Sequence, residues 1–141
     1  METVNKIDIT VTAAIKAPLE KVWKLWTEPG HITKWNNASK DWYTPNAEND
    51  LKVGGKFLYR MEARDGSFGF DFGGTYDEVN QNKLIAYTLG DGRKVKIMFL
   101  SKGRETEIVE TFEAEEENSI DMQRDGWQAI LNNFRDYAEL I

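Results

Sequence analysis

The sequence has no cysteine and only one histidine, His31, in 141 residues. Without cysteine there is no disulfide bond, no thiolate metal site and no cysteine nucleophile. A histidine-based catalytic triad would have to use His31, and no nucleophile lies at a recognisable spacing from it. Phosphate-binding loops, dinucleotide fingerprints, EF-hands and zinc spacings are absent as well. We therefore expect no cofactor, no metal site and no catalytic residue of a familiar kind.

The chain also lacks long apolar runs and an excess of basic residues. No run approaches the ~20 apolar residues that span a bilayer, and the N-terminus lacks the basic-then-apolar layout of a secretory signal. Acidic residues outnumber basic ones by 24 to 18, and the net charge of −6 repels phosphate backbones and anionic membrane surfaces. These absences predict a cytoplasmic protein with no nucleic-acid partner and no membrane insertion. The length fits a single domain over residues 1–141.

Alternating apolar residues on both sides of Asp65-Gly66 predict a β-hairpin. A two-residue turn at this dipeptide fixes the register of the two strands. It places Tyr59 opposite Phe72 on one face and Arg60 opposite Asp71 on the other. Because one register satisfies both faces, the hairpin is strongly specified.

Further turn signals predict that the strands continue as a meander. Together with a first strand at residues 7–15, the remaining strands are expected at residues 84–89, 94–100 and 105–113. Closing the turns places Tyr76 opposite Tyr87, and it places Ile97 opposite Ile108 and Val95 opposite Glu110. The predicted sheet therefore has six antiparallel strands.

Helical periodicity occurs at three places in the chain. Residues 18–27 and 30–35 are expected to form two short helices, followed by a long loop over residues 36–54 that is rich in Asn, Asp and Gly. Residues 119–140 carry apolar side chains on one helical face and polar side chains on the other. The order of elements predicts an α+β fold in which the curved six-stranded sheet wraps around the long C-terminal helix.

Aromatic residues dominate the face of the sheet that this helix would cover. Because rings pack less completely against a single helix at its open end, an apolar cavity is expected there, although the same rings could instead fill a solid core. The candidate ligand-binding residues are Trp35, Tyr59, Phe70, Phe72, Tyr76, Tyr87, Glu110, Trp127, Leu131 and Phe134.

Glu110 is the unusual member of this set. It lies between Ile108 and Phe112 at the spacing that places all three side chains on the covered face. A buried carboxyl group must be paired, protonated or solvated. Glu110 could therefore orient a ligand hydroxyl or act as an acid or base, or it could form a structural ion pair with an Arg or Lys.

Five segments carry a more specific pattern: residues 17–23 (APLEKVW), 47–55 (AENDLKVGG), 65–72 (DGSFGFDF), 74–76 (GTY) and 126–134 (GWQAILNNF). Over nearly the whole chain they resemble the activator of heat-shock protein 90 ATPase homologue family, within the START/Bet v 1-like (SRPBCC) superfamily. The resemblance implies the helix-grip fold and a hydrophobic cavity between the sheet and the C-terminal helix. Relatives often carry an apolar residue at the position of Glu110, so this chain departs from a purely lipid-like cavity.

The resemblance leaves three functions open, because relatives include lipid and polyketide binders, aromatase/cyclases and co-chaperones. The first hypothesis is non-enzymatic binding of a small apolar or aromatic ligand, such as a lipid, a polyketide or a flavonoid-like molecule. The second is a cofactor-independent aromatase/cyclase-type enzyme that uses the same cavity. The third is a co-chaperone or protein-interaction module with a chaperone partner. We expect a monomer or a weak dimer in each case.

Overall fold

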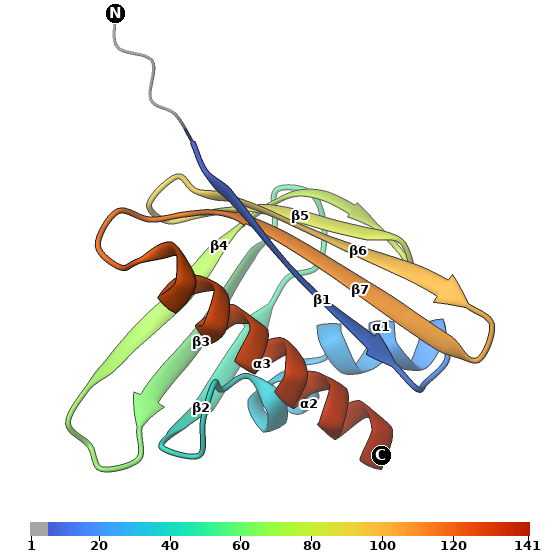
Figure 1. Ribbon diagram of the computed structural model, residues 1–141, viewed down its shortest axis with the longest axis horizontal. Helices are drawn as coiled ribbons and strands as arrows, with labels where there is room; N and C mark the ends of the chain where they lie inside the picture. Colours follow the sequence, from blue (N-terminus) through green and yellow to red (C-terminus); the bar gives the residue numbers. More distant parts are fainter. Residues whose placement is uncertain (1–5) are drawn as a thin grey trace, which may run out of the picture.

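Residues 6–141 are described by the computed structural model, which shows one curved antiparallel sheet and three helices in this part of the chain (Figure 1). In chain order the elements are β1 (Asp8–Ile15), α1 (Leu19–Thr27), α2 (Pro29–Trp35), β2 (Trp42–Asn49), β3 (Lys56–Ala63), β4 (Gly69–Asn80), β5 (Leu84–Leu89), β6 (Lys94–Lys102), β7 (Glu105–Glu113) and α3 (Ile120–Leu140). The strand order is β1-β7-β6-β5-β4-β3-β2, so β1 and β2 form the two edges. This arrangement confirms the helix-grip architecture.

The sheet has seven strands within residues 6–141, so the prediction of six strands was wrong. The additional strand is β2, which lies inside the segment expected to be a long loop. Its polar residues and Pro45 hide the alternation that marks a strand. Pro45 is tolerated because β2 is an edge strand whose register with β3 shifts between Tyr43 and Asn46, so the missing N–H of proline breaks no central ladder.

The central hairpin has the predicted register. Tyr59 pairs with Phe72 and Arg60 pairs with Asp71 across β3 and β4. Gly66 adopts a φ of 77°, the left-handed conformation that the tight turn requires.

The last hairpin is displaced from its predicted register by two residues. Ile97 pairs with Glu110 instead of Ile108, because β6 continues to Lys102 and the chain turns at residues 103 and 104. Gly103 supplies the positive φ of 75° that this later turn needs. A displacement of two residues preserves which face each side chain occupies, so the inward orientation of Glu110 is unchanged.

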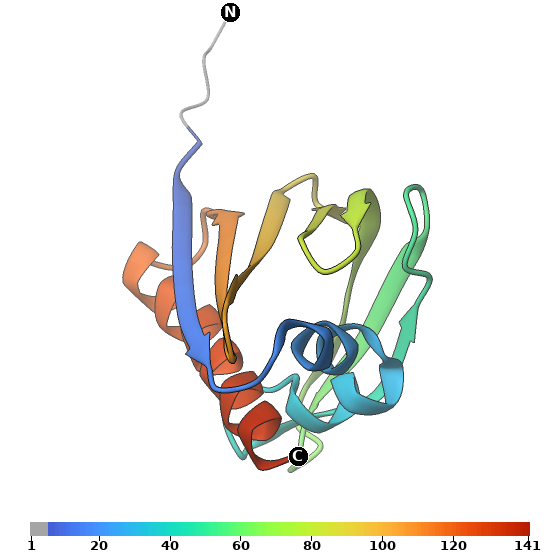
Figure 2. The same ribbon diagram turned by 90° about the vertical axis from the view of Figure 1, so that its right-hand side faces the viewer.

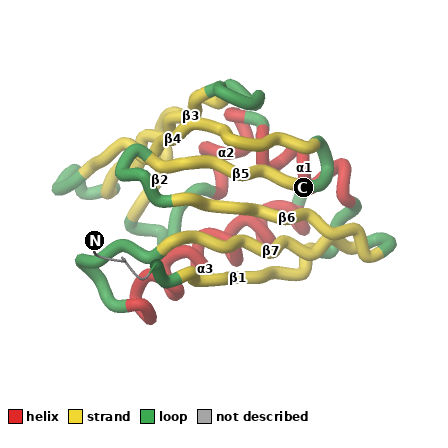
Figure 3. The backbone as a smooth tube through the Cα atoms, turned by 90° about the horizontal axis from the view of Figure 1, so that it is seen from above, coloured by secondary structure: helices red, strands yellow, loops and turns green. Residues whose placement is uncertain are grey.

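The C-terminal helix α3 forms as predicted. Ser119 caps its N-terminus by accepting a hydrogen bond from the backbone N–H of Met122 at 3.1 Å. The helix runs along the concave side of the sheet and packs against β1, while α1 and α2 lie across the open part of the curve (Figure 2). Seen from above, the strands lie side by side in the order β4, β5, β6, β7 and β1, with the helices beneath them (Figure 3). The core therefore lies between one curved sheet and a single layer of helices.

No helix within residues 6–141 has the length and apolar character needed to cross a membrane.

Candidate functional site

A pocket of about 590 Å³ lies between the concave face of the sheet and the helices. Of the ten candidate residues, the structure brings eight to its walls: Trp35, Tyr59, Phe70, Phe72, Tyr76, Tyr87, Glu110 and Trp127. Leu131 and Phe134 instead lie in the adjacent core and are fully buried. Phe134 packs edge-on against Trp26 and Trp35, with ring centroids 4.8 Å and 4.9 Å away. Phe134 therefore supports the pocket wall from behind, and Leu131 belongs to the same buried core.

Phe57 lies at the centre of the aromatic wall and was not among the candidate residues. Its ring centroid is 4.7 Å from that of Tyr87, 5.1 Å from that of Tyr59 and 5.3 Å from that of Tyr76. Gly74 pairs with Phe57 across the strands, and a Cβ at Gly74 would lie 3.1 Å from the Phe57 ring and 2.5 Å from the carbonyl oxygen of Thr88. Gly74 leaves the space that the Phe57 ring occupies. The pairing of these two residues in the hairpin was the sequence signal that could have identified Phe57 as a pocket residue.

A hydrogen-bonded group of polar residues forms one end of the pocket. The Tyr76 hydroxyl donates to Oδ1 of Asn49, and Nδ2 of Asn49 donates to the carbonyl oxygen of Thr27 at 2.7 Å. Burial raises the pKa of Tyr76 to about 12 and raises that of the neighbouring Tyr59 well above its ordinary value. Both tyrosines stay uncharged at physiological pH. At this polar end of the pocket, the hydroxyl of Tyr76 and the amide of Asn49 already have hydrogen-bond partners within the protein.

Glu110 enters the pocket from the middle of β7. Its partners on the two neighbouring strands are Val11 of β1 and Ile97 of β6, neither of which can form a hydrogen bond through its side chain. The Glu110 side chain is buried, with 6% of the residue exposed, and it belongs to no ion pair among residues 6–141. Burial raises its pKa to about 8. The carboxyl group is therefore mostly uncharged at neutral pH and can donate a hydrogen bond.

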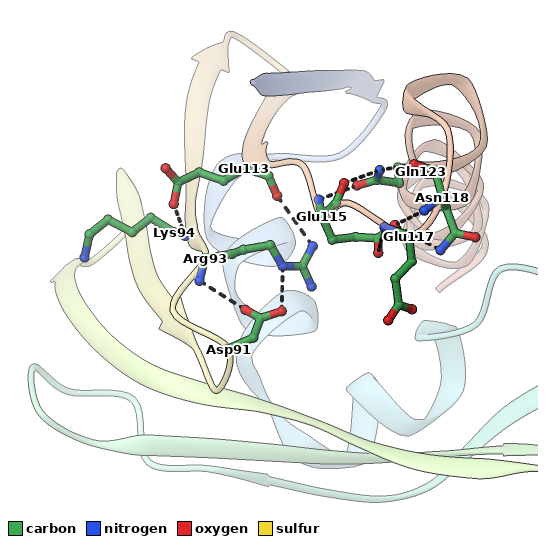
Figure 4. Close-up of polar contacts among 8 residues, drawn as sticks. All are labelled: Asp91, Arg93, Lys94, Glu113, Glu115, Glu117, Asn118 and Gln123. Atoms are coloured by element: carbon green, nitrogen blue, oxygen red, sulfur yellow. Dashed lines mark hydrogen bonds and ion pairs between the residues drawn. The ribbon is translucent and has the colours of Figure 1, made fainter. Parts of the chain in front are cut away.

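The turn after β5 and the connection between β7 and α3 border the mouth of the pocket, and Figure 4 shows the polar contacts that these segments make. Nε of Arg93 donates to Asp91 at 2.8 Å. Nε2 of Gln123 donates to the backbone carbonyls of Glu115 and Asn118, at 3.0 Å and 2.8 Å. No sequence pattern predicts these contacts, because they depend on the conformations of the loops at residues 90–93 and 114–119. The Gln123 contacts hold the start of α3 against the connection that follows β7.

Exposed apolar side chains border the same pocket at its mouth. Phe68 and Met122 are 62% and 61% exposed, and Phe70 is 38% exposed. They come from the β3–β4 hairpin and from the first turn of α3. An apolar molecule entering the pocket would pass between these two segments.

No group of three His, Cys, Asp or Glu side chains suited to a metal ion occurs in residues 6–141.

Comparisons with known proteins agree with this architecture. The model of the family described as Activator of Hsp90 ATPase homolog 1-like protein matches residues 16–139. None of the functionally curated proteins matches the sequence.

Several solved structures share the fold over almost the full chain. An AHSA1-like protein from Aeromonas hydrophila is 42% identical, with a TM-score of 0.90 over 95% of this chain and 93% of its own. Chr148 from Cytophaga hutchinsonii is 56% identical, with a TM-score of 0.82 over 94% of this chain and 92% of its own. The Aha1 dimer from Colwellia psychrerythraea is 19% identical, with a TM-score of 0.73 over 95% of this chain and 97% of its own, a likeness of fold alone.

Proposed function

Because this chain belongs to the Activator of Hsp90 ATPase homolog 1-like family, whose fold commonly binds hydrophobic ligands, we propose that it binds a small apolar or aromatic molecule in the pocket beneath α3. The ligand would be a lipid, a polyketide or a flavonoid-like molecule. It would contact Trp35, Tyr59, Phe70, Phe72, Tyr76, Tyr87, Glu110 and Trp127, with Leu131 and Phe134 supporting the wall.

The observation that carries this proposal is an aromatic-walled space of about 590 Å³ inside a domain of this size. Pockets of roughly 300–1,000 Å³ with mainly apolar walls and few polar groups are the usual sites for small molecules. Rings such as Phe57 and Phe72 offer flat apolar surface at little cost in side-chain entropy. These features favour a planar or elongated apolar ligand.

A blocking variant tests the proposal without disturbing the core. Gly126 lines the pocket from α3, and a Cβ at this position would meet no atom within 4 Å. We expect Gly126→Leu to fill part of the pocket and to abolish the thermal stabilisation caused by apolar probes such as flavanones, fatty acids and polyketide mimics. Asp125→Leu, at an exposed position of the same helix, is the matched control and should bind normally.

Three outcomes of this screen are informative. Stabilisation of the wild type and of Asp125→Leu, but not of Gly126→Leu, supports binding in the pocket. Chemical conversion of a bound probe would indicate an enzyme of the cyclase type, which would use Glu110 as its acid. Equal responses from all three proteins would show that the probes bind elsewhere.

The exposed side chains at the pocket mouth favour a second candidate function, a protein-interaction module. Phe68 and Phe70 extend from the β3–β4 hairpin, where Phe68 is largely solvent-exposed. The family is described by activation of the Hsp90 ATPase, and an exposed aromatic pair is a suitable contact for a protein partner. Stimulation of an Hsp90 ATPase that is lost in Phe68→Ser would support this function, whereas equal rates with and without the protein would exclude it.

A further inference from the structure

The pocket contains polar groups that the protein itself leaves without a partner. Every fully enclosed side-chain nitrogen and oxygen in residues 6–141 has a hydrogen-bond partner. The Glu110 residue is nine-tenths buried, yet its carboxyl group makes no hydrogen bond within residues 6–141. Its carboxyl oxygens are therefore not fully enclosed by protein and are open to the pocket. A carboxyl group in this position recovers its lost hydration only from water or from a ligand.

Within the described part of the chain, the side chains around Glu110 form no hydrogen bond with its carboxyl group. Val11 of β1 and Ile97 of β6 flank it, and Trp127 of α3, which stacks on Phe112 two residues further along β7, lines the same pocket. Tyr87 of β5 is the titratable group near it: burial first, and then the charge of Glu110, raise the pKa of Tyr87 well above its ordinary value. Tyr87 therefore also stays uncharged, and its hydroxyl can serve as a second donor.

Charged groups on the pocket wall lie at its mouth and not beside Glu110. The guanidinium of Arg93 is held by Asp91, and Glu115 accepts hydrogen bonds from the backbone N–H groups of Glu117 and Asn118. The charge of Arg93 is thus largely offset by Asp91, and Glu115 and Glu117 add negative charge to the mouth. An anionic ligand beside Glu110 would lose its hydration without gaining an unpaired cation.

A cationic ligand is also disfavoured. An ammonium group would convert Glu110 to a carboxylate and create a buried ion pair. Because its neighbours Val11 and Ile97 cannot hydrogen-bond to the remaining atoms of such a pair, the desolvation of both charges would go largely uncompensated. An uncharged oxygen that accepts a hydrogen bond avoids both costs.

We propose that Glu110, in its acid form, donates a hydrogen bond to an uncharged carbonyl or ether oxygen of the ligand, so that the pocket selects neutral oxygen-bearing aromatic molecules over hydrocarbons and carboxylates. This inference rests on the proposed binding function and names the chemical class of the ligand. Glu110 is then a specificity-determining residue of the pocket.

Three para-substituted biphenyls of similar shape test the proposal: the methyl ketone, the isopropyl hydrocarbon and the carboxylic acid. Their dissociation constants are measured for the wild type, Glu110→Gln and Glu110→Leu at about pH 6, where Glu110 is protonated. We expect the wild type to bind the ketone about tenfold more tightly than either analogue. Gln retains a donor and should keep the preference over the hydrocarbon, whereas Leu should abolish it.

The pH dependence provides a second readout. Between about pH 6 and about pH 9.5, ketone affinity of the wild type should fall more than tenfold as Glu110 loses its proton, and that of Glu110→Gln should stay constant. Equal affinity of the wild type for the ketone and the hydrocarbon, or a preference retained in Glu110→Leu, would overturn the inference while leaving pocket binding intact. Ketone affinity matched by the carboxylate would also overturn it. Failure of all three probes to bind the wild type would overturn the proposed function itself, and the inference with it.

Discussion

The rings of Phe112 and Trp127 are stacked, with centroids 3.9 Å apart and planes inclined by 11°. Phe112 belongs to β7 and Trp127 to α3, so this stack fastens the C-terminal helix to the sheet. Trp127 also makes an edge-to-face contact with Phe72 of β4, with centroids 6.1 Å apart. One side chain therefore both attaches the helix and forms a wall of the pocket.

Replacing Trp127 should weaken the fold as well as the pocket. We expect Trp127→Ala to lower the free energy of unfolding by about 3 kcal/mol, since the change removes a large ring and its stacking contact with Phe112. Trp42→Ala is the control, because Trp42 lies on the edge strand β2 and contacts only Phe68 and Phe70 among the aromatic rings of residues 6–141. Urea denaturation would contradict the account if both variants lost the same stability.

Glu110 should make the stability of the protein depend on pH. Its pKa is raised from 4.5 to about 8 in the folded state, so the folded state holds a proton that the unfolded state releases between these values. The stabilisation of the folded state by this proton is therefore fully present below about pH 4.5 and is lost as the pH rises toward 8. Between about pH 5 and about pH 8.5 the wild type should lose on the order of 4 kcal/mol relative to Glu110→Gln. A constant difference between the two proteins across this range would contradict the burial of an unpaired acid.

Two glycines should respond to alanine in opposite directions. At Gly126 a Cβ meets no atom within 4 Å, so Gly126→Ala should stabilise the protein by about 1 kcal/mol through helix propensity alone. At Gly74 a Cβ would lie 2.5 Å from the carbonyl oxygen of Thr88, so Gly74→Ala should destabilise by about 1–3 kcal/mol. Thermal unfolding of the two variants checks both signs, and destabilisation by Gly126→Ala would show that the helix is packed more closely at this point.

The Tyr76 hydroxyl should contribute more to stability than a surface hydroxyl. Tyr76→Phe removes the donor to Asn49 in the buried polar end of the pocket and should cost about 1–2 kcal/mol. Tyr43→Phe removes a hydroxyl that donates to Glu62 at 3.1 Å in a more exposed setting and should cost less than half as much. Equal losses in chemical denaturation would indicate that the buried network is not coupled to folding.

Much of this fold could be predicted because side-chain alternation encodes the faces of the sheet. The register of the central hairpin follows from Asp65-Gly66, and the inward orientation of Glu110 survives the displaced last hairpin because a shift of two keeps the face. The strand β2 was missed because its pairing depends on a neighbouring strand and not on its own polar sequence.

The pocket walls were predictable only in part. Helical periodicity places Trp127, Leu131 and Phe134 on one side of α3, but it does not show which turns of the helix face the open pocket. The answer depends on where α1 and α2 pack, and Phe134 is enclosed by Trp26 and Trp35 from those helices. Gln123 and Arg93 depend on loop conformations that sequence spacing does not determine.

The most direct test of the central claim is a titration of the methyl-labelled protein with para-acetylbiphenyl, followed by NMR. The pocket residues Met61, Ile97 and Ile130 should show saturable chemical-shift changes with one ligand per chain. The exposed methyls of Val53 and Leu140, outside the pocket, should remain unchanged. Changes confined to exposed methyls, or no change at saturating ligand, would contradict binding in the pocket beneath α3.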